Sequence, residues 1–93
     1  VDVLAERLRA LRVLAPTSLA QMLDRAGLSE LAAVPGCEAV ALLLADDHEA
    51  VSIAAQEASE IAADHDDPVT HDMLVARMAV HDKAAWLLRS HLD

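Results

Sequence analysis

Apolar residues recur every three or four positions along most of the chain, and this spacing places them on one face of an α-helix. The chain opens inside such a pattern, with no capping residue before it and apolar positions at Val1, Leu4, Leu8 and Leu11. We interpret this segment as the end of a longer helix, which Pro16 ends or which gives way to a connection soon after. Thr17 or Ser18 can cap a short helix that runs to about Arg25.

Beyond a connection at residues 26–36 that contains glycine and proline, the pattern predicts two long helices. The first runs from about Cys37 to Asp64, and its stripe consists of Val40, Leu43, Leu44, Asp47, Val51, Ala54, Ala58 and Ile61. The second spans about Pro68 to Leu92, and its seam repeats every four and three positions at Leu74, Met78, His81, Ala85, Leu88 and Leu92. Asp67 is a good N-cap for this helix, and Pro68 suits the first helical position because its missing N–H costs nothing there.

Two long helices joined by a tight turn predict an antiparallel hairpin. Together with the partial helix and the short helix ahead of them, they indicate an all-α four-helix bundle, truncated at its N-terminus, that lacks one helix and part of another. The composition agrees, since 55% of the 93 residues are apolar but there is one Trp and no Phe or Tyr. A core of Ala, Leu and Val suits closely packed helices. The length allows one domain, which we expect to be a partial bundle over residues 1–93.

Composition and charge argue against several classes of protein. Cys37 is the only cysteine, which excludes an internal disulfide and a cysteine-based zinc site. The longest apolar run, residues 39–45, is far too short to span a bilayer, and no signal-peptide pattern opens the chain, so we expect a cytoplasmic protein. The chain has seven basic and sixteen acidic residues. This balance argues against DNA binding by this segment, because Lys and Arg supply most of the affinity for DNA. An acidic surface attracts cations, although it also simply keeps a protein soluble.

The first candidate for chemistry is a pair of carboxylates, Asp2 and Glu6. They lie one helical turn apart, so both point the same way, and two oxygen ligands on one rigid face suit Fe²⁺, Mn²⁺ or Mg²⁺. Glu6 can equally pair with Arg9, three residues on, across a solvated face. The spacing alone leaves both interpretations open.

Polar residues also fall inside the two long stripes. Asp47 must be paired or hydrogen-bonded if it is buried, and Arg77 and Lys83 on the last helix are possible partners. A structural salt bridge is the simpler interpretation, and a metal or catalytic role is the alternative. His81 occupies a position where a histidine is usually a hydrogen-bonded core residue. No Glu-x-x-His sequence occurs, so this segment lacks the di-iron motif of larger carboxylate bundles.

Acidic residues and two histidines cluster around the last turn, namely Asp64, His65, Asp66, Asp67, His71 and Asp72. Capping and solubility account for such clusters in many loops. If the cluster is repeated around the axis of a symmetric oligomer, it forms a mouth that attracts cations.

Four segments match, in order and spacing, the pattern of one known family. Residues 80–90 read Val-His-Asp-Lys-Ala-Ala-Trp-Leu-Leu-Arg-Ser. They are similar to the closing His-Glu-Lys-x-x-Trp-Met-Leu-Arg of the Dps family, the DNA-binding proteins from starved cells, with Asp82 and Leu87 as departures. Residues 1–8 resemble the family's Asp-x-x-Ala-Glu-Arg segment, residues 45–49 its Asp-His-Glu segment, and residues 67–72 its Asp-x-x-Thr-x-Asp segment.

The resemblance implies a ferritin-like bundle with a short extra helix, here Ser18–Arg25, between the second and third helices. Family members form a spherical shell of twelve subunits, oxidise Fe²⁺ with peroxide or oxygen, and store the ferric iron inside. One subunit supplies an Asp and a Glu to each ferroxidase site, and these correspond to Asp2 and Glu6 as catalytic and metal-binding residues. A neighbouring subunit supplies histidines from a first helix that this sequence does not contain. Asp67 and Asp72 resemble residues that line the pores through which iron enters.

Two functions follow as hypotheses. The chain is either an iron-oxidising and iron-storing homo-oligomer that protects against oxidative stress, or a truncated, non-catalytic helical oligomerisation module that retains the assembly surface without the metal site. Because half of each intersubunit site is present, we expect weak or no ferroxidase activity from this chain alone. The family often has Gly-Gly where this chain has Arg12 and Val13, a departure that bears on the turn after the second bundle helix.

Overall fold

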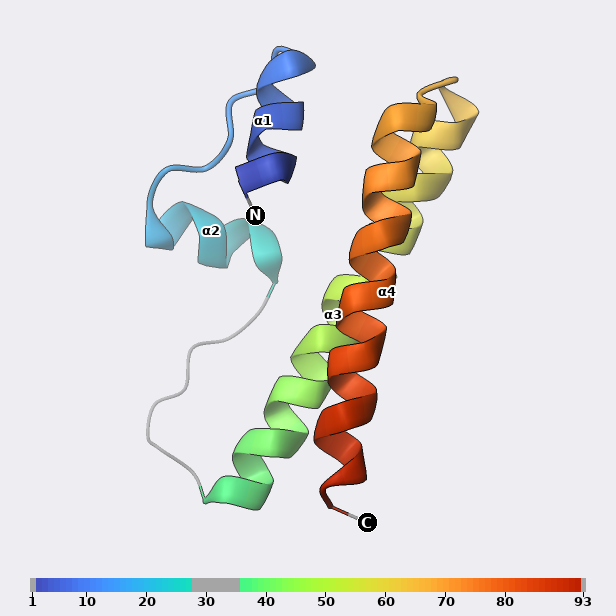
Figure 1. Cartoon of the computed structure of the whole chain (residues 1–93). Helices are drawn as coiled ribbons and strands as arrows, with labels where there is room; N and C mark the ends of the chain where they lie inside the picture. Colours follow the sequence, from blue (N-terminus) through green and yellow to red (C-terminus); the bar gives the residue numbers. More distant parts are fainter. Residues whose placement is uncertain (1, 28–35, 93) are drawn as a thin grey trace. The chain divides into compact units, whose positions relative to one another are not determined.

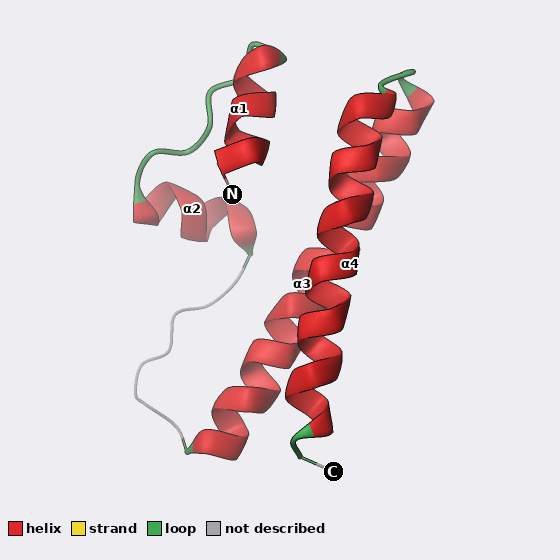
Figure 2. Ribbon diagram, in the orientation of Figure 1, coloured by secondary structure: helices red, strands yellow, loops and turns green. Residues whose placement is uncertain are grey.

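The computed structural model describes residues 2–27 and 36–92, and the chain divides into two compact units, residues 1–34 and 35–93. The described helices are, in chain order, α1 (Asp2–Ala10), α2 (Leu19–Ala26), α3 (Cys37–Asp64) and α4 (Pro68–Ser90). Figures 1 and 2 show these helices, and the described ranges contain no strand. The predicted all-α class is therefore confirmed. None of the described helices combines the length and apolar character needed to cross a membrane.

In the first unit, α1 ends well before Pro16, where the sequence predicted its end. The N–H of Arg12 donates to the carbonyl of Arg9 (2.9 Å), and the N–H of Val13 donates to the carbonyl of Leu8 (2.8 Å). These two bonds form the Schellman motif, which needs a left-handed residue just past the helix. Arg12 takes that conformation, with φ 65°. The turn therefore has the conformation that glycine favours, although Arg12 and Val13 stand where the family often has Gly-Gly. The sequence placed the helix end too late because residues 13–15 are apolar and continue as far as Pro16.

Glycine at position 12 should stabilise this turn. A non-glycine residue in the left-handed region costs about 1–2 kcal/mol. Glycine removes this cost, but its greater freedom in the unfolded chain offsets roughly 0.5–1 kcal/mol of the gain in stability. Arg12→Gly should therefore slow hydrogen exchange at the amides of Arg12 and Val13. Arg9→Gly is the matched control, because the same replacement inside α1 should destabilise the helix by roughly 1 kcal/mol. Faster exchange in Arg12→Gly would contradict the expectation.

The short helix α2 begins and ends as its capping residues predict. Ser18 is the N-cap, and its hydroxyl accepts a hydrogen bond from the N–H of Gln21 (3.2 Å). The side chain of Gln21 accepts in turn from the N–H of Thr17 (2.9 Å). The backbone N–H groups of Thr17 and Gln21 therefore both have side-chain acceptors. Gly27 closes the helix with φ 67°. The predicted range, residues 18–25, is confirmed to within one residue, whereas most of the predicted connection at 26–36 lies outside the described residues.

In the second unit, α3 and α4 form the predicted antiparallel hairpin and pack along their lengths (Figure 1). The predicted bounds of α3 are confirmed, and α4 ends at Ser90, two residues before the predicted end. Between them Asp66 adopts φ 55°, so a second left-handed residue follows α3. The side chain of Asp67 caps α4 by accepting from the N–H of Thr70 (3.1 Å), and Pro68 stands at the first turn, as predicted.

The face of α3 that packs against the hairpin partner differs from the predicted stripe. The buried residues of α3 are all small, namely Ala45, Ser52, Ala55, Ser59 and Ala62. With His48 they repeat every three and four positions, one residue later than the predicted stripe. One residue turns a helix by 100°, so the prediction selected a neighbouring face. Leu44 and Ile61 on the predicted stripe are 44% and 60% exposed.

The seam of α4, by contrast, is confirmed. Ala85 is buried, and the other predicted seam residues are half-buried, namely Leu74, Met78, His81, Leu88 and Leu92. Large side chains on α4 thus pack against a helix whose facing positions are alanine and serine. Small residues let two helix backbones approach closely, and a regular three-and-four spacing keeps the contact continuous along the hairpin. The interface is therefore narrow on the α3 side and sensitive to added volume.

Candidate functional site

The predicted metal pair lies on α1. Residues 2 and 6 both fall within this helix, so their positions are one turn apart, as the sequence predicted. Glu6 is exposed, and in the described part of the chain no hydrogen bond or ion pair joins it to Arg9. The carboxylate of Glu6 is therefore open to a cation. Two carboxylates are fewer ligands than Fe²⁺ takes, so a complete site needs further ligands from elsewhere.

The acidic turn divides into a structural and a solvent-facing part. Asp67 is half-buried, and its carboxylate also accepts from the hydroxyl of Thr70 (2.5 Å). The side chain of Asp72 is 86% exposed and lies 3.6 Å from the ring of His71. An open depression of about 440 Å³ is lined by Ala63, Asp66, Asp67 and Pro68. Of the two predicted pore residues, Asp67 thus has a capping role and Asp72 faces solvent.

A histidine pair joins the two long helices at mid-length. Nδ1 of His48 on α3 lies 2.9 Å from Nδ1 of His81 on α4, and the ring centroids are 5.2 Å apart. Nε2 of His81 lies 3.1 Å from a guanidinium nitrogen of Arg77. Burial lowers the pKa of His81, nearby Arg77 and His48 lower it further, and Asp82 opposes them. The predicted hydrogen bonding of His81 is confirmed, but the residue is half-buried and does not belong to the buried core.

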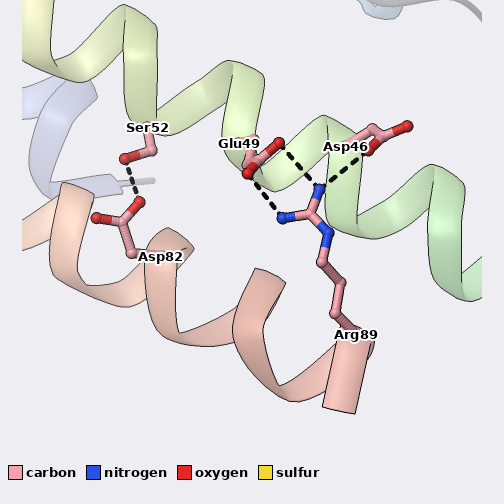
Figure 3. A network of polar contacts seen from close by, with 5 residues as sticks. All are labelled: Asp46, Glu49, Ser52, Asp82 and Arg89. Atoms are coloured by element: carbon pink, nitrogen blue, oxygen red, sulfur yellow. Dashed lines mark hydrogen bonds and ion pairs between the residues drawn. The ribbon is translucent and has the colours of Figure 1, made fainter. Parts of the chain in front are cut away.

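Further polar contacts cross the same interface (Figure 3). Arg89 of α4 donates two hydrogen bonds to Glu49 (2.7 and 2.9 Å) and one to Asp46 (3.0 Å) of α3. The buried hydroxyl of Ser52 donates to Asp82 at 2.5 Å. The hydrogen bond from Arg89 lowers the pKa of Glu49, so this ion pair persists to a pH below the ordinary range of a glutamate.

These contacts correct the predicted partners of Asp47. The sequence suggested Arg77 or Lys83, but among the described residues neither forms an ion pair with Asp47. The seam is displaced by one residue, so Asp46 and Glu49 flank it and meet Arg89 instead. Sequence reasoning missed this ion pair because it placed the wrong face of α3 against α4. The sequence signal for this ion pair was the spacing of three residues between Asp46 and Glu49, which places both carboxylates on the same side of a helix.

Within residues 2–27 and 36–92, no group of three or more His, Cys, Asp or Glu side chains is arranged to hold a metal ion. The histidine pair offers two ring nitrogens, and no third His, Cys, Asp or Glu side chain in these ranges is arranged with them to hold a metal ion. The assignment of Asp2 and Glu6 to an iron site stays a prediction from the sequence.

Comparison with known proteins agrees with the helical architecture. The family model of the ferritin-like domain matches residues 1–93. DNA protection during starvation protein 2 of Bacillus anthracis is 27% identical over 93 residues. The alignment covers all of this chain and 64% of that protein, so the chain spans less than two thirds of its relative's length. No solved structure matches at a significant level.

Proposed function

The chain belongs to the ferritin-like domain family, and on that premise we propose that it acts as a Dps-like mini-ferritin. It binds Fe²⁺, takes part in its oxidation by peroxide or oxygen, and stores ferric iron in an oligomeric shell in the cytoplasm. The observation that carries this proposal is the family match over all 93 residues. The relative's name, a protein that protects DNA during starvation, supports a protective role, and the Dps resemblance extends that role to oxidative stress.

Iron is the substrate, and Asp2 and Glu6 are its proposed ligands. Their positions one turn apart on α1 support this assignment, since carboxylate oxygens suit Fe²⁺. Histidines from another subunit complete the site, as the Dps resemblance implies. Two Fe²⁺ ions give one electron each to one peroxide, whose O–O bond breaks and which takes up two protons to form two waters. Such paired transfer releases no hydroxyl radical. The carboxylates bind the iron, and their negative charge stabilises Fe³⁺ over Fe²⁺.

Exposed apolar side chains support the oligomeric part of the proposal. On α3 and α4 these include Leu42, Leu43, Leu44, Ile53, Ile61, Val69, Val75, Val80, Trp86 and Leu87. Exposed apolar side chains in this number leave apolar surface that packing against other protein would cover. A dodecamer is the assembly we propose. Light scattering coupled to size-exclusion chromatography would reveal a particle of about twelve 9.9 kDa chains. A monomer or dimer would contradict assembly by this chain alone.

The site assignment is tested by anaerobic titration of the chain with Fe²⁺. Loss of a residue that only supports a ligand weakens metal binding by roughly 10- to 100-fold, so Asp2→Ala with Glu6→Ala should weaken iron binding at least that much. The matched control is Glu57→Ala with Glu60→Ala, which removes the same charge from exposed positions of α3. The assignment would be wrong if iron binding were unchanged in the first variant or equally weakened in the control. Either result would favour a non-catalytic assembly module.

A further inference from the structure

The contacts of His48 and His81 fix where their protons lie. Arginine only donates hydrogen bonds, so Nε2 of His81, 3.1 Å from Arg77, must be an unprotonated acceptor. The proton of neutral His81 is then on Nδ1, and this N–H donates across 2.9 Å to Nδ1 of His48. His48 must therefore carry its own proton on Nε2. One pair of neutral tautomers satisfies both contacts.

An additional proton breaks this arrangement wherever it binds. The pair would then hold three protons on four ring nitrogens. If Nε2 of His81 stays unprotonated, both Nδ1 atoms carry hydrogens that face each other across 2.9 Å. If any other nitrogen is the unprotonated one, Nε2 of His81 carries a hydrogen and meets the N–H of Arg77 donor to donor, so the contact with Arg77 fails. Both contacts survive only while both rings are neutral.

We propose that His48 and His81 form a proton-sensitive latch between α3 and α4, which holds the hairpin together while both rings are neutral and releases it when either is protonated. His48 occupies a seam position of α3 and His81 one of α4, so the latch lies within the helix interface. It works independently of the iron site, and its failure in a test would leave the proposed function untouched.

Burial and Arg77 favour the neutral state of His81. On α4, Arg77 contacts His81 directly and opposes a second positive charge, whereas neighbouring Asp82 favours one but is itself hydrogen-bonded by Ser52 of α3. Also on α3, Glu49 is bound by Arg89, and Asp47 is half-buried beside His48. Burial and Arg77 together lower the pKa of His81 despite Asp82.

The sign of the pH dependence follows from that direction. A histidine whose pKa is lower in the folded than in the unfolded chain binds its proton more readily when unfolded. The stability from the latch is thus complete above the ordinary histidine value of about 6.5, and it is lost as the pH falls from there through the lowered value of folded His81. The ion pair of Glu49 and Arg89 stays formed over this range, because Arg89 lowers the pKa of Glu49.

Thermal unfolding of the whole chain between pH 7.5 and pH 5.5 tests the latch. The wild type should lose roughly 4–8 °C of Tm over this range, the shift that loss of one such interaction causes in a domain of this size. The double variant His48→Gln with His81→Gln should lose clearly less. His91→Gln, which removes an exposed histidine at the end of α4, should behave as the wild type. Equal losses in the wild type and the double variant would overturn the proposal.

A spectroscopic measurement keeps the proposal testable if the double variant does not fold. In the ¹⁵N-histidine-labelled wild type above pH 7, two-bond ¹H–¹⁵N correlations should show His81 protonated on Nδ1 and His48 on Nε2. Nε2 protonation of both rings would exclude the hydrogen bond between them and overturn the latch. Arg77→Met should also move the pH midpoint of the stability loss toward neutral, whereas Lys83→Met, the same charge change at an exposed position of α4, should move it less.

Discussion

Leucine in place of Ala55 is expected to destabilise the hairpin by about 1–3 kcal/mol, because extra methylenes in a packed seam force neighbouring side chains and backbone to move. Ala55 is only 7% exposed and lies between the buried Ser52 and Ser59. The described buried residues of α3 are alanine or serine, so this side of the interface is built for small groups. Urea unfolding followed by far-UV circular dichroism gives the change in free energy.

Ala54→Leu is the matched control, one residue away on the same helix. Ala54 is exposed, and substitutions at such positions usually change stability by no more than about 0.5 kcal/mol. Ala54 belongs to the stripe that the sequence predicted, and Ala55 belongs to the seam in the structure. A larger loss for Ala54→Leu than for Ala55→Leu would show that the predicted stripe is the packed face after all.

Removal of the cap at Asp67 is the second large effect. Replacement of an N-cap by alanine costs about 0.5–2 kcal/mol, and Asp67 accepts hydrogen bonds from both the N–H and the hydroxyl of Thr70. Asp67→Ala should therefore lie toward the upper end of that range in urea unfolding. A loss below the measurement error would contradict the capping role that the structure gives this residue.

Asp67→Asn separates this cap from the proposed attraction of iron. Asparagine is as good an N-cap as aspartate but carries no charge, so it should retain most of the stability. If Asp67 also draws Fe²⁺ toward a pore, both variants should slow iron uptake into the assembled protein, and Asp72→Asn should add to the effect. Uptake at the wild-type rate in Asp67→Asn would leave Asp67 as a cap alone.

Local signals in the sequence determined the boundaries of most helices. Ser18, Asp67 and Pro68 each act within one helical turn, because a cap satisfies amides three residues away, and the structure uses them as predicted. The end of α1 is the exception. There Arg12 adopts a conformation that glycine prefers, so the residue type gave no warning of the turn.

The sequence also determined the family, since four short segments with matching order do not depend on how the helices pack. It placed Asp2 and Glu6 one turn apart for the same reason: helical spacing is local. Their role in iron binding stays a prediction, because the remaining ligands of such a site would come from residues distant in sequence or from another subunit.

Only the tertiary structure decided which face of α3 meets α4. Hydrophobicity favoured the stripe of leucines and isoleucine, but close packing of two helices favours small residues at the contact, and α3 buries Ala45, Ala55 and Ala62 instead. That rotation of one residue replaced the expected partners of Asp47 with the ion pairs of Arg89, and it brought His48 to His81. The spacing of apolar residues predicts that a helix has a buried face. Which of two adjacent faces is buried depends on the shape of the partner helix, and no local pattern contains that information.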